Sequence, residues 1–233
     1  MIPLKDDNPT FSTPYVTVGL IILNCLVYVY QLALGAYGQA FVLQTGAIPA
    51  ELTSFSRLSP LTAASPVPLY LTPLTSMFVH GGFFHVGFNM LYLWIFGNNV
   101  EDRFGHLAFF LFYILCGISA SMIHALSDIN SHAPMVGASG AIAGVLGAYL
   151  IMFPRAKIVT LVILIIFITV IRIPAVVFLG LWFFIQILNA KSGAGNVAWY
   201  AHLGGFMAGL IFTGIWATKR FTPRRGPARY KYH

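Results

Sequence analysis

Four polar residues stand near the starts of three apolar segments, where polar side chains are costly in a membrane. Ser139 lies in Gly-Ala-Ser-Gly, and His202 lies in Ala-His-Leu-Gly-Gly. His85 and Asn89 are four residues apart, so they share one face of a helix. Each has an ordinary structural explanation, because a lone Ser, His or Asn in an apolar helix commonly packs or bonds to a neighbour. Their occurrence together favours a functional site.

A serine beside a neutral histidine has the parts of an activated nucleophile. No Asp or Glu lies in the predicted helices that carry these residues, so the sequence predicts a dyad of Ser139 and His202 without a third, acidic member. Acyl transfer also needs hydrogen-bond donors for the oxyanion. We expect them from the His85 and Asn89 side chains and from the backbone N–H of Ser139.

A metal-dependent mechanism does not fit the spacing of the histidines. His80 and His85 are five residues apart, the chain has no HExxH motif, and no carboxylate is nearby. We therefore expect no metal ion at these histidines. Cys25 and Cys116 both lie inside apolar segments and form neither a disulfide framework nor a zinc-binding spacing.

The composition indicates a membrane protein that crosses the bilayer several times. Of the 233 residues, 58% are hydrophobic and 8% are charged, and the mean hydropathy is +0.80. A soluble domain carries about 25% charged residues. These values exclude an ordinary soluble enzyme and a disordered chain.

Six apolar segments are predicted to be membrane helices, which makes the fold class an all-α bundle. They cover residues 15–34, 83–96, 107–126, 138–153, 174–188 and 197–217. The proline-rich connection at 35–82 is predicted to be a partly interfacial loop. Residues 158–171 are apolar but too few for a span, so they either lie at the membrane interface or extend the fifth helix.

The positive charges predict the orientation. With six spans and a cytoplasmic N-terminus, eleven of the thirteen Lys and Arg residues fall on the cytoplasmic side, leaving Arg57 and Lys191 outside. We expect a cytoplasmic segment at 1–14, a six-helix domain at 15–217 and a basic cytoplasmic tail at 218–233. A basic tail after an apolar helix is typical of contact with a lipid bilayer, so we expect no nucleic-acid partner. The expected location is a prokaryotic cytoplasmic membrane.

This topology places the polar residues near one membrane face, since the second, fourth and sixth helices all run inward. The fourth helix is roughly 24 Å long at 1.5 Å per residue, against a hydrocarbon core of about 30 Å. Ser139 is therefore predicted to lie below the outer surface. Small residues four apart, at 140 and 144 and at 205 and 209, predict that the fourth and sixth helices approach closely.

Taken in order, three motifs resemble the signature of the rhomboid family of intramembrane serine proteases. They are His85-Val-Gly-Phe-Asn89, Gly137-Ala-Ser139-Gly140 and Ala201-His202-Leu-Gly-Gly205. Gly97-Asn-Asn-Val-Glu101, followed by Arg103 and Gly105, resembles the family's junction between the second and third helices. The resemblance covers about residues 15–217.

The resemblance implies a six-helix core with Ser139 as nucleophile and His202 as base. It implies that His85 and Asn89 stabilise the oxyanion, that His80 is structural, and that the substrates are single-pass membrane proteins cut in or near their spans without a cofactor. Two positions depart from the family pattern. Leu71-Thr72 replaces a Trp-Arg pair, and Ala143 replaces an aromatic residue that stacks on the base histidine in some members, which leaves open how His202 is held.

Two other functions are compatible with a polytopic membrane protein. A catalytically inactive rhomboid-like protein would bind membrane clients, but such proteins typically lack the serine or the histidine, and this chain has both. A channel or transporter would be expected to show inverted repeats or charges at the membrane midplane, and the sequence shows neither. The sequence therefore favours an active endopeptidase.

Overall fold

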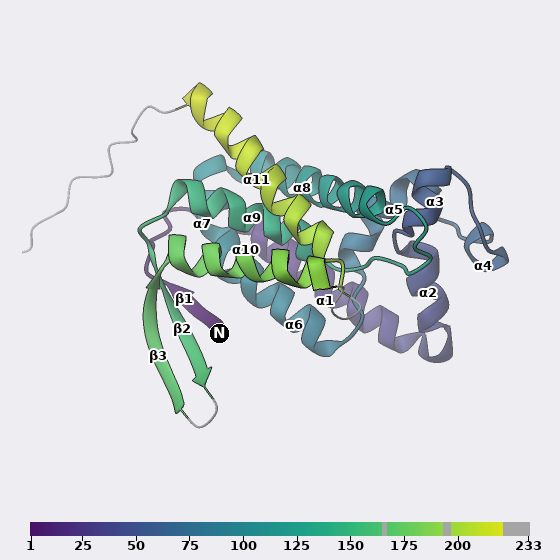
Figure 1. Cartoon of the computed structure of the whole chain (residues 1–233), viewed down its shortest axis with the longest axis horizontal. Helices are drawn as coiled ribbons and strands as arrows, with labels where there is room; N and C mark the ends of the chain where they lie inside the picture. The colour runs from purple at the N-terminus through teal and green to yellow at the C-terminus, as the bar shows by residue number, and fades with distance from the viewer. Residues whose placement is uncertain (165–166, 193–196, 221–233) are drawn as a thin grey trace, which may run out of the picture.

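The computed structural model describes residues 1–164, 167–192 and 197–220. Most of the basic tail expected at 218–233 lies outside the described residues. Long helices run along the longest axis of the molecule, short helices gather at one end, and a small sheet projects from the other (Figure 1).

Most of the predicted spans appear as long helices. Among the described residues, four are long and apolar enough to cross a membrane, and these are α1 (Tyr15–Ala33), α8 (His106–Ser127), α10 (Ala175–Ser192) and α11 (Trp199–Arg220). A shorter apolar helix, α9 (Ser139–Met152), corresponds to the predicted fourth span. The predicted second span is a continuous run of α6 (Phe83–Tyr92), the π-helix η4 (Leu93–Gly97) and α7 (Asn98–Phe104). It continues beyond residue 96, where the sequence analysis ended it.

Local chemistry explains where several helices begin and end. The backbone N–H groups of Val16 and Thr17, in the first turn of α1, donate to the Glu101 carboxylate at 2.9 and 2.7 Å. A carboxylate at this end satisfies N–H groups that lack helical partners and complements the helix dipole. Gly105, at φ 82°, separates α7 from α8. Pro154 follows the end of α9 and cannot continue its hydrogen-bond pattern.

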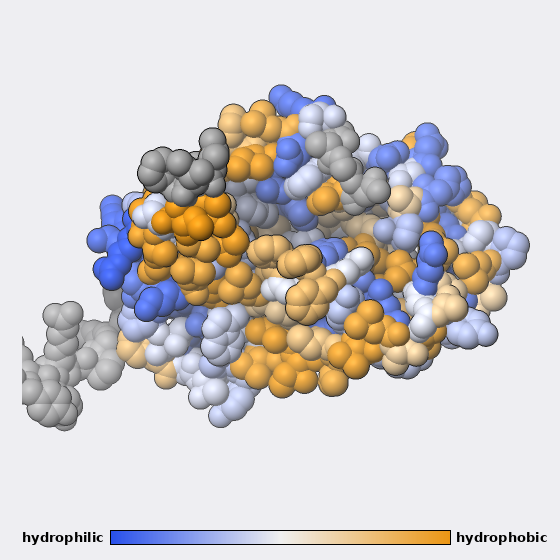
Figure 2. All heavy atoms as spheres, turned by 90° about the horizontal axis from the view of Figure 1, so that it is seen from below, coloured by the Kyte–Doolittle hydropathy of each residue, from blue (hydrophilic) through white to orange (hydrophobic). Residues whose placement is uncertain are grey.

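Helix α9 forms the centre of the bundle. Every residue from Gly140 to Tyr149 is buried, because α8 and α11 pack along this short helix and α10 and η4 also contact it. Such burial explains why its sequence is apolar on all faces and rich in Gly and Ala. Apolar residues also lie on the surface. Figure 2 shows them over much of the face in view, as expected for a protein surrounded by lipid.

The loop at 35–82 folds into short helices, in agreement with its prediction as a connection and not a span. Glu51 is 1% exposed and forms an ion pair with Arg57 at 2.9 Å. The same carboxylate accepts from the backbone N–H of Leu58 and the hydroxyl of Thr62. The elements are η1 (Gly35–Tyr37), α2 (Gly38–Thr45), α3 (Pro49–Ser54), α4 (Pro60–Ala63), η2 (Leu69–Leu71), α5 (Thr72–Thr75) and η3 (Ser76–Phe78).

The ambiguous segment at 158–171 does not extend the fifth helix. Its described residues, 158–164 and 167–171, lie in β2 (Lys157–Leu164) and β3 (Phe167–Pro174), which pair antiparallel with Ile158 opposite Ile173, and 165–166 lie outside the described residues. The physical reason is its content of Ile, Val and Thr, whose branched side chains favour strands over helices. The N-terminal strand β1 (Ile2–Asp6) pairs with β2, giving the order β1-β2-β3. The sequence analysis did not predict this sheet.

Candidate active site

The first residue of α9 meets the fourth residue of α11 near the N-terminal ends of both helices. The Oγ atom of Ser139 lies 2.8 Å from Nε2 of His202, which is hydrogen-bonding distance. Both side chains are only partly buried. The structure therefore brings together the two residues that the sequence proposed as a pair, although they are 63 positions apart.

Glycines set the separation of the two helices that carry the pair. A Cβ atom added to Gly205 would fall on the carbonyl oxygen of Gly140, and one added to Gly209 would fall on that of Gly144. The backbones of α9 and α11 are thus in direct contact, as their small-residue patterns predicted. This contact holds Ser139 within reach of His202.

The segment before Ser139 is held by the loop at 35–82. The N–H of Gly137 donates to the carbonyl of Ser76 at 2.9 Å, and Ala47 and Met135 exchange two backbone hydrogen bonds. Gly137 has φ 118°, a conformation that side chains with a Cβ rarely adopt. These contacts fix the entry of the chain into α9 and hence the position of its first side chain.

His85 and Asn89, both on α6, lie beside the backbone that leads to Ser139. A Cβ on Gly137 would stand 2.6 Å from Nε2 of His85 and 3.6 Å from Nδ2 of Asn89. The N–H of Gly81 donates to Nδ1 of His85 at 3.3 Å, so a neutral ring carries its proton on Nε2 and can donate there. Asn89 is 7% exposed, and its Nδ2 has no acceptor among the described residues.

His80 contacts His85, and neither of its ring nitrogens has a hydrogen-bond partner among the described residues. It is fully buried, and its ring packs edge-on against that of His85 with centroids 5.1 Å apart. The side chain of Gln31 pairs with its backbone, donating to the His80 carbonyl at 2.8 Å. The structural role that the family resemblance implied for His80 stays a prediction.

The sequence analysis missed a third polar side chain at His202. Oε1 of Gln186, on α10, lies 2.8 Å from Nδ1 of His202. The sequence signal for Gln186 was an uncharged amide among the apolar residues of α10, and no motif surrounds it. Two aromatic rings also flank the imidazole, with centroid distances of 6.1 Å to Trp182 and 5.8 Å to Trp199. These rings supply the aromatic contact that Ala143 cannot make.

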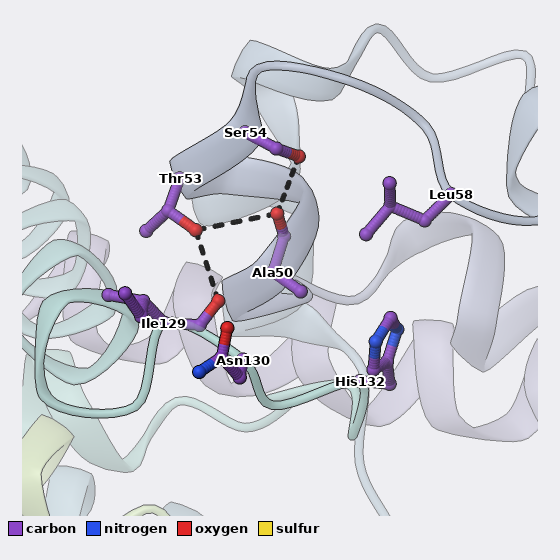
Figure 3. A pocket seen from close by; sticks show the side chains of 7 residues that line it. All are labelled: Ala50, Thr53, Ser54, Leu58, Ile129, Asn130 and His132. Carbon is purple, nitrogen blue, oxygen red and sulfur yellow. Dashed lines mark hydrogen bonds between the residues drawn. The ribbon is translucent and has the colours of Figure 1, made fainter.

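A hollow of about 360 Å³ lies away from this pair, between α3 and the segment after α8. Figure 3 shows Ser54 and His132 on its wall, but the Ser54 hydroxyl donates to the Ala50 carbonyl of its own helix at 2.6 Å. The hollow therefore offers no second activated serine. In the part of the chain that the structure describes, no group of three or more His, Cys, Asp or Glu side chains is placed to hold a metal ion.

The sequence model of the Rhomboid domain matches residues 70–219, which is more than half of the chain and includes all four candidate residues. The chain belongs to the rhomboid family. Family membership and the apolar helices together identify an integral membrane protein.

Rhomboid proteins from several kingdoms are similar to this chain. "Rhomboid protein 1, mitochondrial" of Saccharomyces cerevisiae is 33% identical over 147 residues, covering 59% of this chain and 39% of that protein. "RHOMBOID-like protein 1" of Arabidopsis thaliana is 32% identical over 160 residues, covering 67% and 38%. "Rhomboid protease GluP" of Bacillus subtilis is 44% identical over 77 residues, covering 33% and 15%. The chain thus spans well under half the length of these relatives.

Proposed function

We propose that this rhomboid protein is an intramembrane serine endopeptidase with Ser139 as nucleophile and His202 as general base. The observation that carries the proposal is the 2.8 Å separation of Ser139 Oγ and His202 Nε2. An imidazole at this distance can take the hydroxyl proton as the oxygen attacks a carbonyl carbon. The name of one relative, Rhomboid protease GluP, agrees with this chemistry.

The proposed reaction proceeds through an acyl-enzyme. Ser139 Oγ bonds to the carbonyl carbon while its proton moves to His202 Nε2, which gives a tetrahedral oxyanion. The C–N bond then breaks as His202 returns the proton to the leaving amine. Water next attacks the acyl-enzyme with His202 again as base, which releases the carboxylic acid and restores the Ser139 hydroxyl.

Stabilisation of the oxyanion is assigned to His85 and Asn89. Nε2–H of His85 and Nδ2 of Asn89 both lie beside Gly137, two residues before the nucleophile. A buried donor without an acceptor costs free energy, so the unpaired Asn89 amide supports a role that is completed only when substrate supplies an oxygen.

The substrates are proposed to be membrane-protein helices that cross or enter the bilayer, because the nucleophile stands at the end of a buried membrane helix. Both termini are proposed to face the cytoplasm on the strength of the charge distribution. The relatives come from a yeast, a plant and a bacterium. Residence in a prokaryotic cytoplasmic membrane is therefore part of the proposal and rests on the sequence expectation alone.

The decisive experiment is covalent labelling of the purified protein with a fluorophosphonate, followed by mass spectrometry of the modified peptide. We expect labelling at Ser139 and its loss in both Ser139→Ala and His202→Ala, with folding intact. Turnover of a membrane substrate should be lost in the same variants. A folded, unlabelled parent protein would favour the inactive client-binding alternative, and turnover by folded Ser139→Ala would contradict the mechanism.

A further inference from the structure

Both ring nitrogens of His202 form hydrogen bonds, and the partner of Nδ1 is a residue with no assigned role. Nε2 faces Ser139 Oγ and Nδ1 faces Oε1 of Gln186, each at 2.8 Å. Gln186 is 4% exposed although it lies on α10, which has few buried residues. A buried amide on a lipid-facing helix requires a specific partner, because an unpaired polar group is costly there.

The orientation of the Gln186 amide follows from its other hydrogen bond. Nε2 of Gln186 donates to the carbonyl of Trp182, one turn earlier on the same helix, at 3.1 Å. A carbonyl can only accept, so the NH₂ group must point toward Trp182 and the amide oxygen toward His202. The reversed amide would lose the hydrogen bond to Trp182, because two carbonyl oxygens would then face each other, and it could donate to Nδ1 only in the opposite tautomer of His202.

The fixed amide oxygen selects one tautomer of the histidine. Since Oε1 of Gln186 can only accept, Nδ1 of a bonded His202 carries the proton. Nε2 of the neutral ring is then unprotonated and accepts from the Ser139 hydroxyl. The other tautomer would place a proton between Nε2 and the serine, where it would block removal of the hydroxyl proton.

We propose that Gln186 is a positioning residue that holds His202 in the tautomer and ring orientation required of the base. The inference rests on the proposed protease function and deepens it. The site then consists of Ser139, His202 and Gln186, which two hydrogen bonds connect in that order. They are contributed by α9, α11 and α10. An amide at the third position avoids the desolvation of a carboxylate inside the bilayer while keeping an acceptor for Nδ1–H.

Two substitutions of similar length separate hydrogen bonding from packing. Gln186→Met removes the acceptor oxygen, and Gln186→Glu retains an oxygen at the same place. We expect Gln186→Met to lower kcat and the rate of fluorophosphonate labelling at Ser139 by about 10-fold or more, with KM changed by less than about 2-fold. Gln186→Glu should recover most of both rates.

The chain provides a matched control in Asn24 on α1. Its side chain is also a buried amide that donates to a carbonyl one turn earlier, that of Leu20, at 2.7 Å. Asn24→Leu removes a buried amide far from His202 in sequence and helix, so kcat should stay at the parent value. All variants are compared at equal folded fraction, measured by thermal unfolding in detergent.

The outcomes distinguish this inference from the function on which it rests. Labelling of the parent at Ser139 combined with unchanged kcat in Gln186→Met would overturn the positioning role alone. Equal losses in the Met and Glu variants would also overturn it, since packing would then explain both. A folded parent that is neither labelled nor active would overturn the protease function and the positioning role together.

Discussion

The two proposed oxyanion donors, His85 and Asn89, lie close to the same glycine, Gly137. The His85 and Asn89 nitrogens both approach Gly137, so a substrate carbonyl above Ser139 would meet two donors on the same side. We expect Asn89→Ala to lower kcat by about 10²-fold, because removal of one preorganised oxyanion donor costs on this scale. His85→Ala should act similarly. Steady-state kinetics at equal folded fraction provide the measurement. Unchanged kcat in both variants would show that His85 and Asn89 have a structural role and do not stabilise the oxyanion.

The conformation of Gly137 can be tested by adding a single methyl group. We expect Gly137→Ala to abolish turnover, since the added Cβ would stand 2.6 Å from His85 Nε2 and the backbone has φ 118°. Gly180→Ala on α10 is the matched control, because nothing lies within 4 Å of its added Cβ. A fully active Gly137→Ala enzyme would show that the segment before Ser139 does not need this conformation.

The residues of the site were accessible to sequence reasoning to different degrees. Ser139 and His202 could be paired because their motifs lie at the starts of two helices with complementary glycine spacing. Gln186 could not, since its partner is 16 residues away on another helix and neither its type nor its neighbours form a motif. The rings of Trp182 and Trp199 were missed for the same reason, because contacts between helices depend on rotation about axes that a sequence does not specify.

At the scale of helices, the contact between α9 and α11 is expected to limit activity. Gly205→Leu should lower kcat far more than it lowers the yield of folded protein, and Gly205→Ala should do so to a smaller degree, because a Cβ there meets the Gly140 carbonyl. A displacement of about 1 Å can cost about 10²-fold in rate. Gly144→Leu should also lower kcat, since its Cβ would stand 3.2 Å from the Gly205 carbonyl oxygen of α11 and 2.5 Å from Cys116 of α8.

The control for this prediction lies on the same helix. Gly214 of α11 has nothing within 4 Å of an added Cβ, so Gly214→Ala should leave kcat unchanged. Activity and thermal unfolding are measured on all the variants. Full activity with bulky residues at both 144 and 205 would show that this contact does not determine the distance between Ser139 and His202.

The helices were easier to predict than the sheet for a physical reason. Long uninterrupted apolar segments are recognisable locally, because each must satisfy its own backbone hydrogen bonds in lipid. A sheet depends on pairing between distant segments, and here residues 2–6 pair with 158–161. The β-branched content of 158–171 hinted at strands, but its apolar character alone was equally compatible with an interfacial segment.

For the molecule as a whole, orientation in the membrane is the first expectation to test. A reporter fused after His233 should be cytoplasmic, and one inserted near Arg57 should be external, because eleven of the thirteen Lys and Arg residues then fall inside. Alkaline phosphatase and fluorescent-protein fusions report the two sides. An external C-terminus would be incompatible with six spans and a cytoplasmic N-terminus.

Substrate selection is also a property of the whole molecule, since a helix must open before Ser139 can attack it. Each unpaired backbone group costs several kcal/mol in hydrocarbon, and Gly and Pro disfavour helix by about 1 and 3 kcal/mol relative to Ala. A substrate with Gly and Pro in its outer segment should therefore be cut faster than the same helix with Leu there. Equal rates at the same bond would show that opening is not limiting.

The sheet is connected to Gln186, the hydrogen-bond partner of His202, by a single stretch of chain. Strand β3 runs through Pro174 directly into α10, and the Ala175 N–H donates to the Ala156 carbonyl beside the start of β2. Gln186 lies eleven residues along that helix from Ala175, about 16 Å away at 1.5 Å per residue. Strand β1 is anchored in turn, because Asp6 accepts from Tyr149 and Asn99. A displacement of β3 would therefore reach Gln186 along the axis of α10, whereas the contacts of Asp6 tie β1 to α7 and α9.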